Sequence, residues 1–486
     1  MRLIPKMERV QVKKKCLVLL TVAASLSVAS SSFAAMAGAN TVNSAAIVDG
    51  SIATVDIANA AVTGAKIATG TITGTQLAAG AVTDAKITDV SMAKVTGLTA
   101  AIAAKADLSA LNATNSLLAG KAAINHTHLL GNVTIVATEG GEYVSPVDAM
   151  NDLNNWCGVP SSTNPCLLKL MPGVYNLGNS SLVLPAFVSI SGSGRESTYI
   201  NSNGVWTLKT AGIGSSEVSS VSLGGTNQSS GNSRYGTVLL ENNVRLSDVT
   251  VNHSSTESGA GTSYGVCVQN ASVDMANVEV NVNSTAASQG IYLSANSASN
   301  LSANLNNVTV SADCGFECSG VYFDGFPKKV TMGNMNVSAT TKSTVSGQAV
   351  RGIALFNYSA AGRGAYELNN LQISVNGGGY TQGLLVYGNN DATLRNSLIT
   401  ATNGNGGYTY GLLAGETYAG MKGVVSASNS SFNVDASGLA IYLNSSLETI
   451  KVANSMIAGG VARMGGTLDC INNFDSNLAP FVCPAN

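Results

Sequence analysis

Two short motifs of alternating apolar and polar residues recur between residues 244 and 462. In the first, an Asn or Asp is followed by apolar residues at the first and third positions, as in Asp248-Val249-Thr250-Val251. In the second, a Gly is followed by the same alternation, as in Gly290-Ile291-Tyr292-Leu293. Alternation of period two over four or five residues is typical of a β-strand with one buried face.

The first motif occurs eight times, at intervals of 25 to 36 residues, and repeats of this period indicate a stacked array. Its Asn or Asp stands at 248, 277, 307, 334, 370, 396, 429 and 454. No helical pattern of ten or more residues separates the motifs, so we predict an all-β solenoid in which each strand pairs with its equivalent one coil later. Eight coils at about 4.8 Å each give a rod roughly 40 Å long. A meander of β-hairpins is the competing architecture.

Each motif predicts which side chains face inward and which face outward. The residue three after each Asn or Asp should form one buried row, from Val251 through Val280 to Ile457. The Asn itself fits a bend, where it tolerates a left-handed backbone. The residue two after each Gly should point outward, which gives the row Cys267, Tyr292, Tyr322, Ala354, Leu385 and Leu413. Tyr292 and Tyr322 would lie one coil apart, a spacing that suits contact with sugar rings or an aromatic ladder that stabilises the sheet.

The first 35 residues have the pattern of a secretory signal peptide. Three lysines at 13–15 precede an apolar run at 16–24 and then small residues up to Ala34. The apolar run is too short to span a bilayer, and no later run reaches 18 apolar residues, so we expect a secreted protein without a membrane span.

Residues 36–96 are interpreted as a stalk that contains four ten-residue repeats at 50–89. Each repeat has two apolar positions: Ile52 and Ile57, Val62 and Ile67, Ile72 and Leu77, and Val82 and Ile87. Two apolar side chains per repeat cannot close a core within one chain. The segment is therefore a flexible spacer or is buried between chains. It resembles the repeats of phage tail fibres and other fibrous surface proteins.

Residues 97–142 combine an imperfect apolar heptad pattern with His126 and His128. The His-x-His segment also resembles tail fibres, in which such histidines from three chains gather around an axial iron, a metal that imidazole suits. Two exposed histidines in a junction are the alternative. Because the apolar positions of the stalk have no partner within one chain, we predict a homotrimer formed through the stalk.

Residues 143–200 resemble the opening of pectin-lyase-like right-handed parallel β-helices. The resemblance lies in a short helix at 147–153, a Pro172-Gly173 turn after a strand, and a Gly192-Ser193-Gly194 bend before a Thr-x-Ile strand. It implies a right-handed parallel β-helix domain at 143–486 with a short N-terminal capping helix. Residues 203–236, rich in Ser and Gly, are interpreted as an extended loop.

Composition excludes one class of partner. Charged residues make up 11% of the chain and the net charge is −2, so no basic stripe is available to hold a nucleic-acid backbone.

Seven cysteines follow the signal peptide. Cys157 with Cys166, Cys314 with Cys318, and Cys470 with Cys483 lie close in sequence, and in an oxidising compartment they should form local disulfides. Cys267 is not part of these pairs, so it is a free thiol or forms a disulfide with another chain.

The motifs of pectin methylesterases, polygalacturonases and pectate lyases are all absent, which argues against catalysis. His253, the only histidine within the repeats, is expected in a loop. Glycoside hydrolysis needs two carboxylates about 5 to 9.5 Å apart. Glu279, Asp313, Glu317 and Asp324 are the candidate carboxylates, but any solenoid with this many acids offers such pairs by chance.

We therefore expect an adhesin-like fibrous surface protein whose β-helix binds glycans or a cell envelope. A polysaccharide lyase or hydrolase with an unrecognised carboxylate site is one alternative, and a passive spacer is the other.

Overall fold

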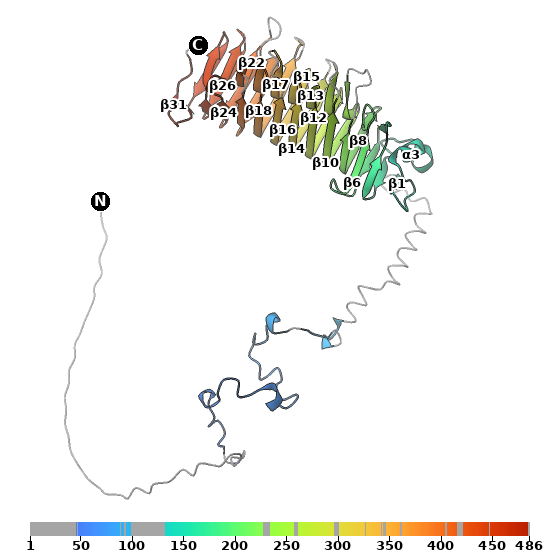
Figure 1. The fold of residues 1–486 in the computed structure, drawn as a ribbon, viewed down its shortest axis with the longest axis vertical. Helices are drawn as coiled ribbons and strands as arrows, with labels where there is room; N and C mark the ends of the chain where they lie inside the picture. The colour runs from blue at the N-terminus through green and yellow to red at the C-terminus, as the bar shows by residue number, and fades with distance from the viewer. Residues whose placement is uncertain are drawn as a thin grey trace, which may run out of the picture. The chain divides into compact units, whose positions relative to one another are not determined.

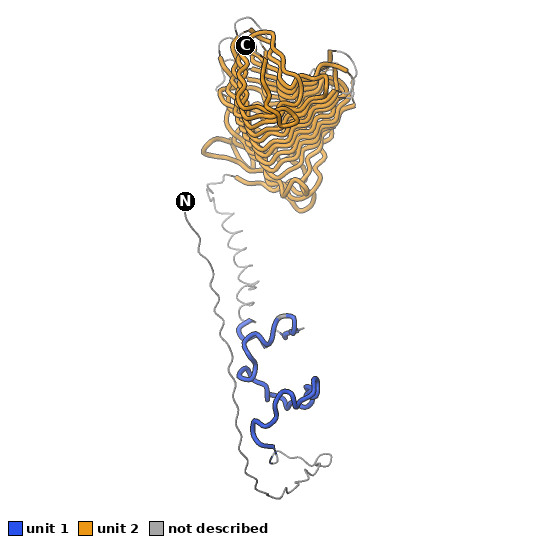
Figure 2. The backbone as a smooth tube through the Cα atoms, turned by 90° about the vertical axis from the view of Figure 1, so that its left-hand side faces the viewer, with its two compact units in different colours: residues 1–120 blue, residues 121–486 orange. Residues whose placement is uncertain are grey.

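A computed structural model describes residues 45, 47–87, 89–91, 94–98, 132–226, 234–256, 261–295, 301–325, 327–341, 343, 347–359, 362–403, 406–415, 421–446 and 448–484. The chain forms two compact units, residues 1–120 and 121–486 (Figure 2).

The second unit is a parallel β-solenoid of about nine turns, as predicted (Figure 1). Each strand pairs with its equivalent in the next coil, and the pairings between the described strands are parallel except that of β30 with β31. This pairing excludes the meander of hairpins.

The strands form two sheets. The first sheet consists of β1 (Asn132–Val136), β2 (Cys166–Leu170), β3 (Gly173–Asn176), β5 (Val188–Ser191), β6 (Thr198–Ser202), β8 (Ser215–Gly225), β10 (Asn243–Ser255), β12 (Val273–Ser284), β14 (Ser302–Cys314), β16 (Lys329–Thr341), β18 (Gly364–Asn376), β20 (Asn390–Arg395), β21 (Leu398–Thr402), β23 (Val424–Ser428), β24 (Ser431–Val434), β26 (Thr449–Ala453), β27 (Met456–Ala458), β29 (Thr467–Ile471), β30 (Asn473–Phe474) and β31 (Pro480–Phe481). The second consists of β4 (Leu182–Pro185), β7 (Leu208–Ala211), β9 (Arg234–Leu240), β11 (Thr262–Gln269), β13 (Ala287–Ala295), β15 (Cys318–Gly325), β17 (Ala349–Asn357), β19 (Tyr380–Gly388), β22 (Tyr408–Gly415), β25 (Leu439–Asn444) and β28 (Gly460–Arg463).

The repeated Asn bends each coil of the first sheet. Asn277 has φ 58° and Asn370 has φ 56°, so the predicted left-handed backbone is confirmed. These side chains bond one another from coil to coil. Asn277 Nδ2 donates to Asp248 Oδ1 at 2.9 Å, and Asn370 Nδ2 donates to Asn334 Oδ1 at 2.7 Å.

The inward rows are those that the alternation predicted. Val251, Val280, Val310, Val337, Ile373, Ile399, Phe432 and Ile457 follow one another in register, and each is buried. The predicted fold and its core register are confirmed.

The repeated Gly marks the line where the two sheets approach most closely. A Cβ built on Gly290 would lie 2.3 Å from Val310 Cγ1 of the first sheet and 2.6 Å from the Gly320 carbonyl oxygen. Gly352 and Gly383 meet Ile373 and Ile399 in the same way. A Cβ would clash at these positions, which favours Gly at the start of the second motif, although Thr237 in β9 and Ala440 in β25 occupy the equivalent positions of their coils.

The prediction of a loop at 203–236 was wrong. Strands β7, β8 and the first three residues of β9 lie in this stretch, and β8 pairs in register with β10. Ser220, with φ 54°, takes the place of the repeated Asn. The bend therefore forms at a Ser instead of an Asn. Because the search used the Asn motif, this coil was not recognised in the sequence.

The N-terminal end of the solenoid carries helices α3 (Pro146–Asn151) and α4 (Leu153–Trp156), where the capping helix was predicted (Figure 1). Ser145 caps α3 by accepting a hydrogen bond from the Val147 backbone N–H at 3.2 Å, and Pro146 follows at the first helical position. Strand β1 pairs with β2, so the solenoid begins at Asn132, ahead of residue 143, where the sequence placed the domain boundary.

In the first unit the stalk repeat makes a turn every five residues. The backbone N–H groups of residues 51, 56, 61, 66, 71, 76, 81 and 86 each bond the carbonyl three residues earlier, at 2.8–3.1 Å. Short 3₁₀ turns lie at η2 (Thr54–Asp56), η3 (Gly64–Lys66) and η4 (Asp84–Lys86). The eight apolar positions of the repeats are each 37–53% exposed. The described part of the stalk thus closes no core of its own.

Candidate functional site

The outer side of the second sheet carries a continuous group of aromatic rings. Its strands bend at the repeated Gly, so the residue before the Gly and the residue two after it both point outward. We call this surface the aromatic face; its rings belong to Trp206, Tyr264, Tyr292, Tyr322, Phe356, Tyr387, Tyr380, Tyr408, Tyr410 and Tyr442. Successive rings lie 5.1–6.5 Å apart between centroids.

The N-terminal half of this face is a second, smaller core. Tyr292 pairs with Tyr322 one coil away, as predicted, with ring centroids 5.9 Å apart, but Tyr292 is only 4% exposed. Its hydroxyl donates to Asp324 Oδ2 at 3.0 Å. Burial, and then the Asp324 charge, raises the pKa of Tyr292 to about 12. Tyr292 therefore offers little ring surface to a sugar.

Cys267 lies in the same outward row but is completely buried among Trp206, Tyr264 and Tyr292. It is a free cysteine, and burial raises the pKa of its thiol to about 12. The predicted outward direction does not bring Cys267 to the surface, because Tyr264, the residue before the repeated Gly, packs in the same outer cluster.

The C-terminal half of the face is open. We call Tyr380, Tyr408, Tyr410 and Tyr442 the tyrosine platform. Tyr380 and Tyr408 stack at 5.4 Å with an interplanar angle of 15°, and Tyr410 and Tyr442 stack at 5.3 Å and 14°. Tyr408 is 62% exposed. Burial, and then the neighbouring tyrosines, raises the pKa of Tyr410 to about 12, so the phenol of Tyr410 stays uncharged at ordinary pH.

Between the two halves lies an anchored arginine. Arg351 Nη1 is 2.5 Å from Glu317 Oε1, Arg351 Nε donates to Gln382 Oε1 at 3.1 Å, and the guanidinium lies 5.8 Å from the Phe356 ring centroid. A second arginine, Arg234, lies 5.4 Å from the Tyr292 ring centroid. Both cations thus rest on aromatic rings.

The structure distributes the four candidate carboxylates over two sheets. Glu317 directly precedes β15 and Asp324 lies near the end of that strand, roughly 20 Å further along the chain. Glu279 pairs with Thr309, four residues before Asp313 on β14, which is roughly 13 Å along that strand. Glu317 is held by Arg351, and Asp324 by Tyr292. Neither strand pairing places two of these acids opposite each other.

The expectation that His253 lies in a loop was wrong. It is in β10, faces inward and is 2% exposed. Its Nδ1 lies 3.3 Å from Thr237 Oγ1, and its Nε2 has no hydrogen-bond partner. Burial lowers the pKa of His253 to about 4.

All three expected cysteine pairs are disulfides in the structure. They join Cys157 to Cys166, Cys314 to Cys318, and Cys470 to Cys483, with Cα–Cα distances of 5.6–6.0 Å. The first holds the helical cap to β2, the second closes the turn between β14 and β15, and the third holds the C-terminal segment to β29.

The proposed iron ligands His126 and His128 lie outside the described residues, as do the signal peptide and most of the heptad segment. Within the described ranges, no group of three His, Cys, Asp or Glu side chains is placed to hold a metal ion. In the same part of the chain, no helix is long and apolar enough to cross a membrane.

No protein-family model and no curated protein matches the chain. Three similar solved structures are a mannuronan C-5 epimerase A-module from Azotobacter vinelandii, the pectin methylesterase from carrot and an alginate lyase from Paenibacillus sp. str. FPU-7. Their identities are 10%, 10% and 11%, and their TM-scores 0.34, 0.27 and 0.28. The similarities cover 66%, 73% and 69% of this chain and 92%, 86% and 97% of those chains. At these identities and TM-scores the similarities carry no further argument, and the parallel β-solenoid rests on the strand pairing of this chain.

Proposed function

We propose that this chain is a secreted, adhesin-like protein whose solenoid binds glycans or a glycan-bearing cell envelope through the tyrosine platform. The observation that carries this proposal is the exposure of Tyr408, 62%, beside the stacked rings of Tyr380, Tyr410 and Tyr442. Tyrosines combine a broad apolar ring with a polar hydroxyl, which suits the mixed surface of a sugar. The sequence drew attention to Tyr292 and Tyr322, which belong to the same face, but the accessible rings lie further along it.

The surroundings of the platform favour binding over chemistry. Gln382, two residues after Tyr380 on β19, is hydrogen-bonded by Arg351. The four candidate carboxylates all precede β17 in the chain, and Glu317 and Asp324 already have partners. We therefore propose that the bound glycan is retained and not cleaved.

Binding and cleavage should be measured together on a panel of soluble polysaccharides. Replacing Tyr380 and Tyr408 by Ser should weaken binding strongly while leaving the fold intact, because both side chains are exposed. Phe316→Ser is the matched control, since Phe316 is 45% exposed and lies outside the platform. Unchanged binding by the double variant would refute the platform, and shortened polysaccharide chains would support the lyase or hydrolase alternative.

The remaining proposals concern export and assembly. The signal peptide would export the chain, and three disulfides suit an oxidising compartment. The exposed apolar positions of the stalk would join three chains. Multivalent display by a trimer would raise avidity for a repetitive surface without any new contact.

A further inference from the structure

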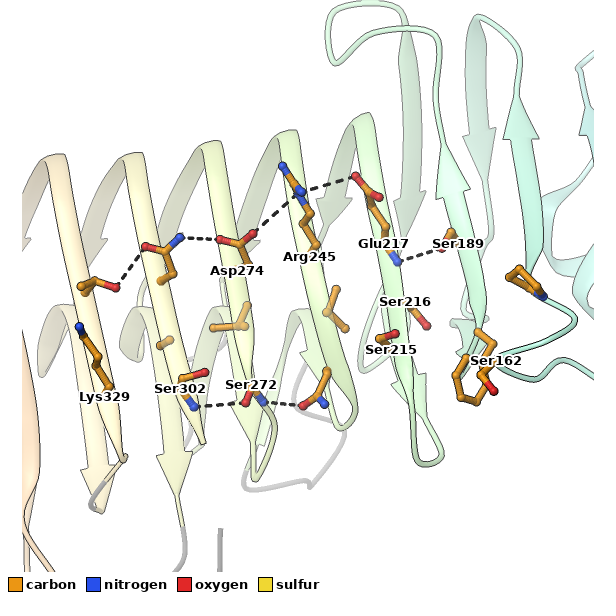
Figure 3. A pocket seen from close by; sticks show the side chains of 18 residues that line it. Ser162, Ser189, Ser215, Ser216, Glu217, Arg245, Ser272, Asp274, Ser302 and Lys329 are labelled. Carbon is orange, nitrogen blue, oxygen red and sulfur yellow. Dashed lines mark hydrogen bonds and ion pairs between the residues drawn. The ribbon is translucent and has the colours of Figure 1, made fainter. Parts of the chain in front are cut away.

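A trough lies on the outer side of the first sheet, away from the aromatic face. It crosses β8, β10, β12, β14 and β16 before their Asn bends and has a volume of about 790 Å³ (Figure 3). Val244, Val273 and Ala303 follow one another in register beneath it, but their side chains are buried in the core of the solenoid, so the strand backbone forms the floor. Phe187 and Pro165 also line it, and both belong to the earliest coils. The trough therefore runs along the solenoid, across successive coils.

One wall of the trough is a row of polar side chains that bond one another across the coils. Arg245 Nε lies 3.9 Å from Glu217 Oε1 and 3.8 Å from Asp274 Oδ2 (Figure 3). Asn304 Nδ2 donates to Asp274 Oδ1 at 2.7 Å, and Thr331 Oγ1 donates to Asn304 Oδ1 at 3.2 Å. Both ion pairs of Arg245 use Nε and its side chain is 56% exposed, so a five-donor guanidinium keeps donors for a ligand.

The other wall is a row of Asn and Ser two residues earlier in each strand or just before it. Ser272 N–H donates to Asn243 Oδ1 at 2.9 Å, and Ser302 N–H donates to Ser272 Oγ at 3.2 Å. Each wall thus presents one polar side chain per coil, at a spacing of about 4.8 Å. Lys329 continues this row in β16.

The charges of the trough cancel. Glu217 and Asp274 are balanced by Arg245 and Lys329, and Lys329 is also 3.2 Å from Glu367. A polyanion or a polycation would therefore meet like charges as well as opposite ones and gain little from the site.

We propose that the trough binds an extended, uncharged polysaccharide that lies along the solenoid with one sugar unit per coil. The length of a sugar unit in an extended chain is close to the coil spacing, whereas a peptide strand advances by only about 3.3 Å per residue. The sugar chain would lie over the strand backbone between the two walls and direct its hydroxyls toward the polar side chains on both sides. This surface is separate from the tyrosine platform, and the inference does not rest on it.

The test uses the full mature chain and β-1,4-linked gluco-, manno- and xylo-oligosaccharides of two to eight units, with calorimetric measurement of affinity. Because the trough crosses five coils, affinity should rise with each unit and level off at about five units. Arg245→Ala should weaken binding by about tenfold or more, because it removes a charged hydrogen-bond donor. Ser302→Trp, which fills the trough, should abolish binding. Oligo-uronates of the same lengths should bind more weakly than the neutral chains.

Lys451→Ala is the matched control, since Lys451 is an exposed cation in the same outward row of a later coil. Melting curves of each variant report the fold. Lack of binding by every neutral oligosaccharide, or equal binding by the wild type and both trough variants, would overturn the proposal. Loss of binding only in the Tyr380 and Tyr408 double variant would reject the trough and leave the proposed function standing. Loss of binding only in the trough variants would support the trough and reject the tyrosine platform of the proposed function.

Discussion

His253 places an ionisable ring inside the solenoid. Its pKa is lowered from the ordinary value of 6.5 to about 4 by burial, and the Nε2 atom has no partner there. Between these two pKa values the unfolded chain binds a proton that the folded chain excludes. The stability associated with this histidine is therefore complete above pH 6.5 and is lost as the pH falls toward 4.

We predict that His253 makes the free energy of unfolding, measured by urea denaturation, about 2 kcal/mol lower at pH 5 than at pH 8. His253→Val should remove this part of the pH dependence, because Val282 already fills the equivalent position in the next coil. Subtracting the profile of the variant from that of the wild type cancels the contribution of the carboxylates. Parallel profiles for the two proteins would contradict the prediction.

Cys267 is predicted to be inert toward thiol reagents in the folded protein. The thiolate is the reactive form, and burial raises the thiol pKa to about 12. An aromatic disulfide reagent at pH 8 should modify fewer than about one thiol per ten chains under native conditions and about one per chain in denaturant. Rapid native modification, or an interchain disulfide on a non-reducing gel, would show that the cover over Cys267 opens.

Side-chain direction was easier to predict from sequence than burial. Period-two alternation correctly placed Val251 inward and Tyr292 in the outward row. It could not show that Tyr264, one residue before a repeated Gly, also turns outward and covers Cys267. That outcome depends on the bend at Gly265 and on rings from neighbouring coils, which a single strand pattern does not contain. Tyr408 was missed for the same reason, because its exposure depends on the coil that follows.

At the scale of the strand, the Gly row makes a direct prediction about stability. Gly290→Ala should destabilise the solenoid by about 2 kcal/mol or more, because the new Cβ would lie 2.3 Å from Val310 Cγ1 and 2.6 Å from the Gly320 carbonyl oxygen. The backbone of two coils must move to admit it. Urea denaturation followed by circular dichroism measures the change.

Gly333→Ala provides the comparison for that variant. Gly333 is also in a strand, but the nearest atom to its Cβ would be Asn306 Oδ1 at 3.4 Å, an ordinary contact. The urea midpoint of the Gly333→Ala variant should stay close to that of the wild type. If both variants unfold at the same urea concentration, the Gly row has room for a Cβ, and the close approach of the two sheets at Gly290 is contradicted.

The strands that the sequence missed show how far a repeat can drift while its fold persists. In β8 the bend residue is Ser220, and in β9 Val238 pairs with Val266 although the preceding Gly236 is one position out of phase with Gly265. Both changes keep the inward apolar positions, which are what the packing requires. A search of the sequence for the repeated Asn and Gly therefore finds the regular coils but misses the first coils. In those coils only the buried Val and Leu positions keep the strands in register.

At the scale of the whole molecule, the stalk is the segment that most needs a partner chain, because its apolar side chains are exposed. Its eight apolar side chains recur every five residues, one after each turn, and each is 37–53% exposed. Full burial of a Val, Ile or Leu contributes roughly 1.5–3 kcal/mol, so about half of that, roughly 6–12 kcal/mol per chain, is unrealised in a single chain. A second and third copy have the same five-residue period and can match it along the whole segment.

We therefore predict that the mature chain, residues 36–486, is a trimer by light scattering, whereas a chain that begins at Asn132 is a monomer because the solenoid has its own core. Replacing Ile57, Ile67 and Leu77 by Asp should dissociate the full chain without changing the melting of the solenoid. Thr54, Thr63 and Thr75, changed to Asp in the same repeats, serve as the polar control.

If the trimer forms, three copies of His126 and His128 would meet, and metal analysis should find iron that is lost when both are changed to Ala. A monomeric full-length chain would refute the trimer and the iron site together, since two histidines per chain cannot hold the metal alone.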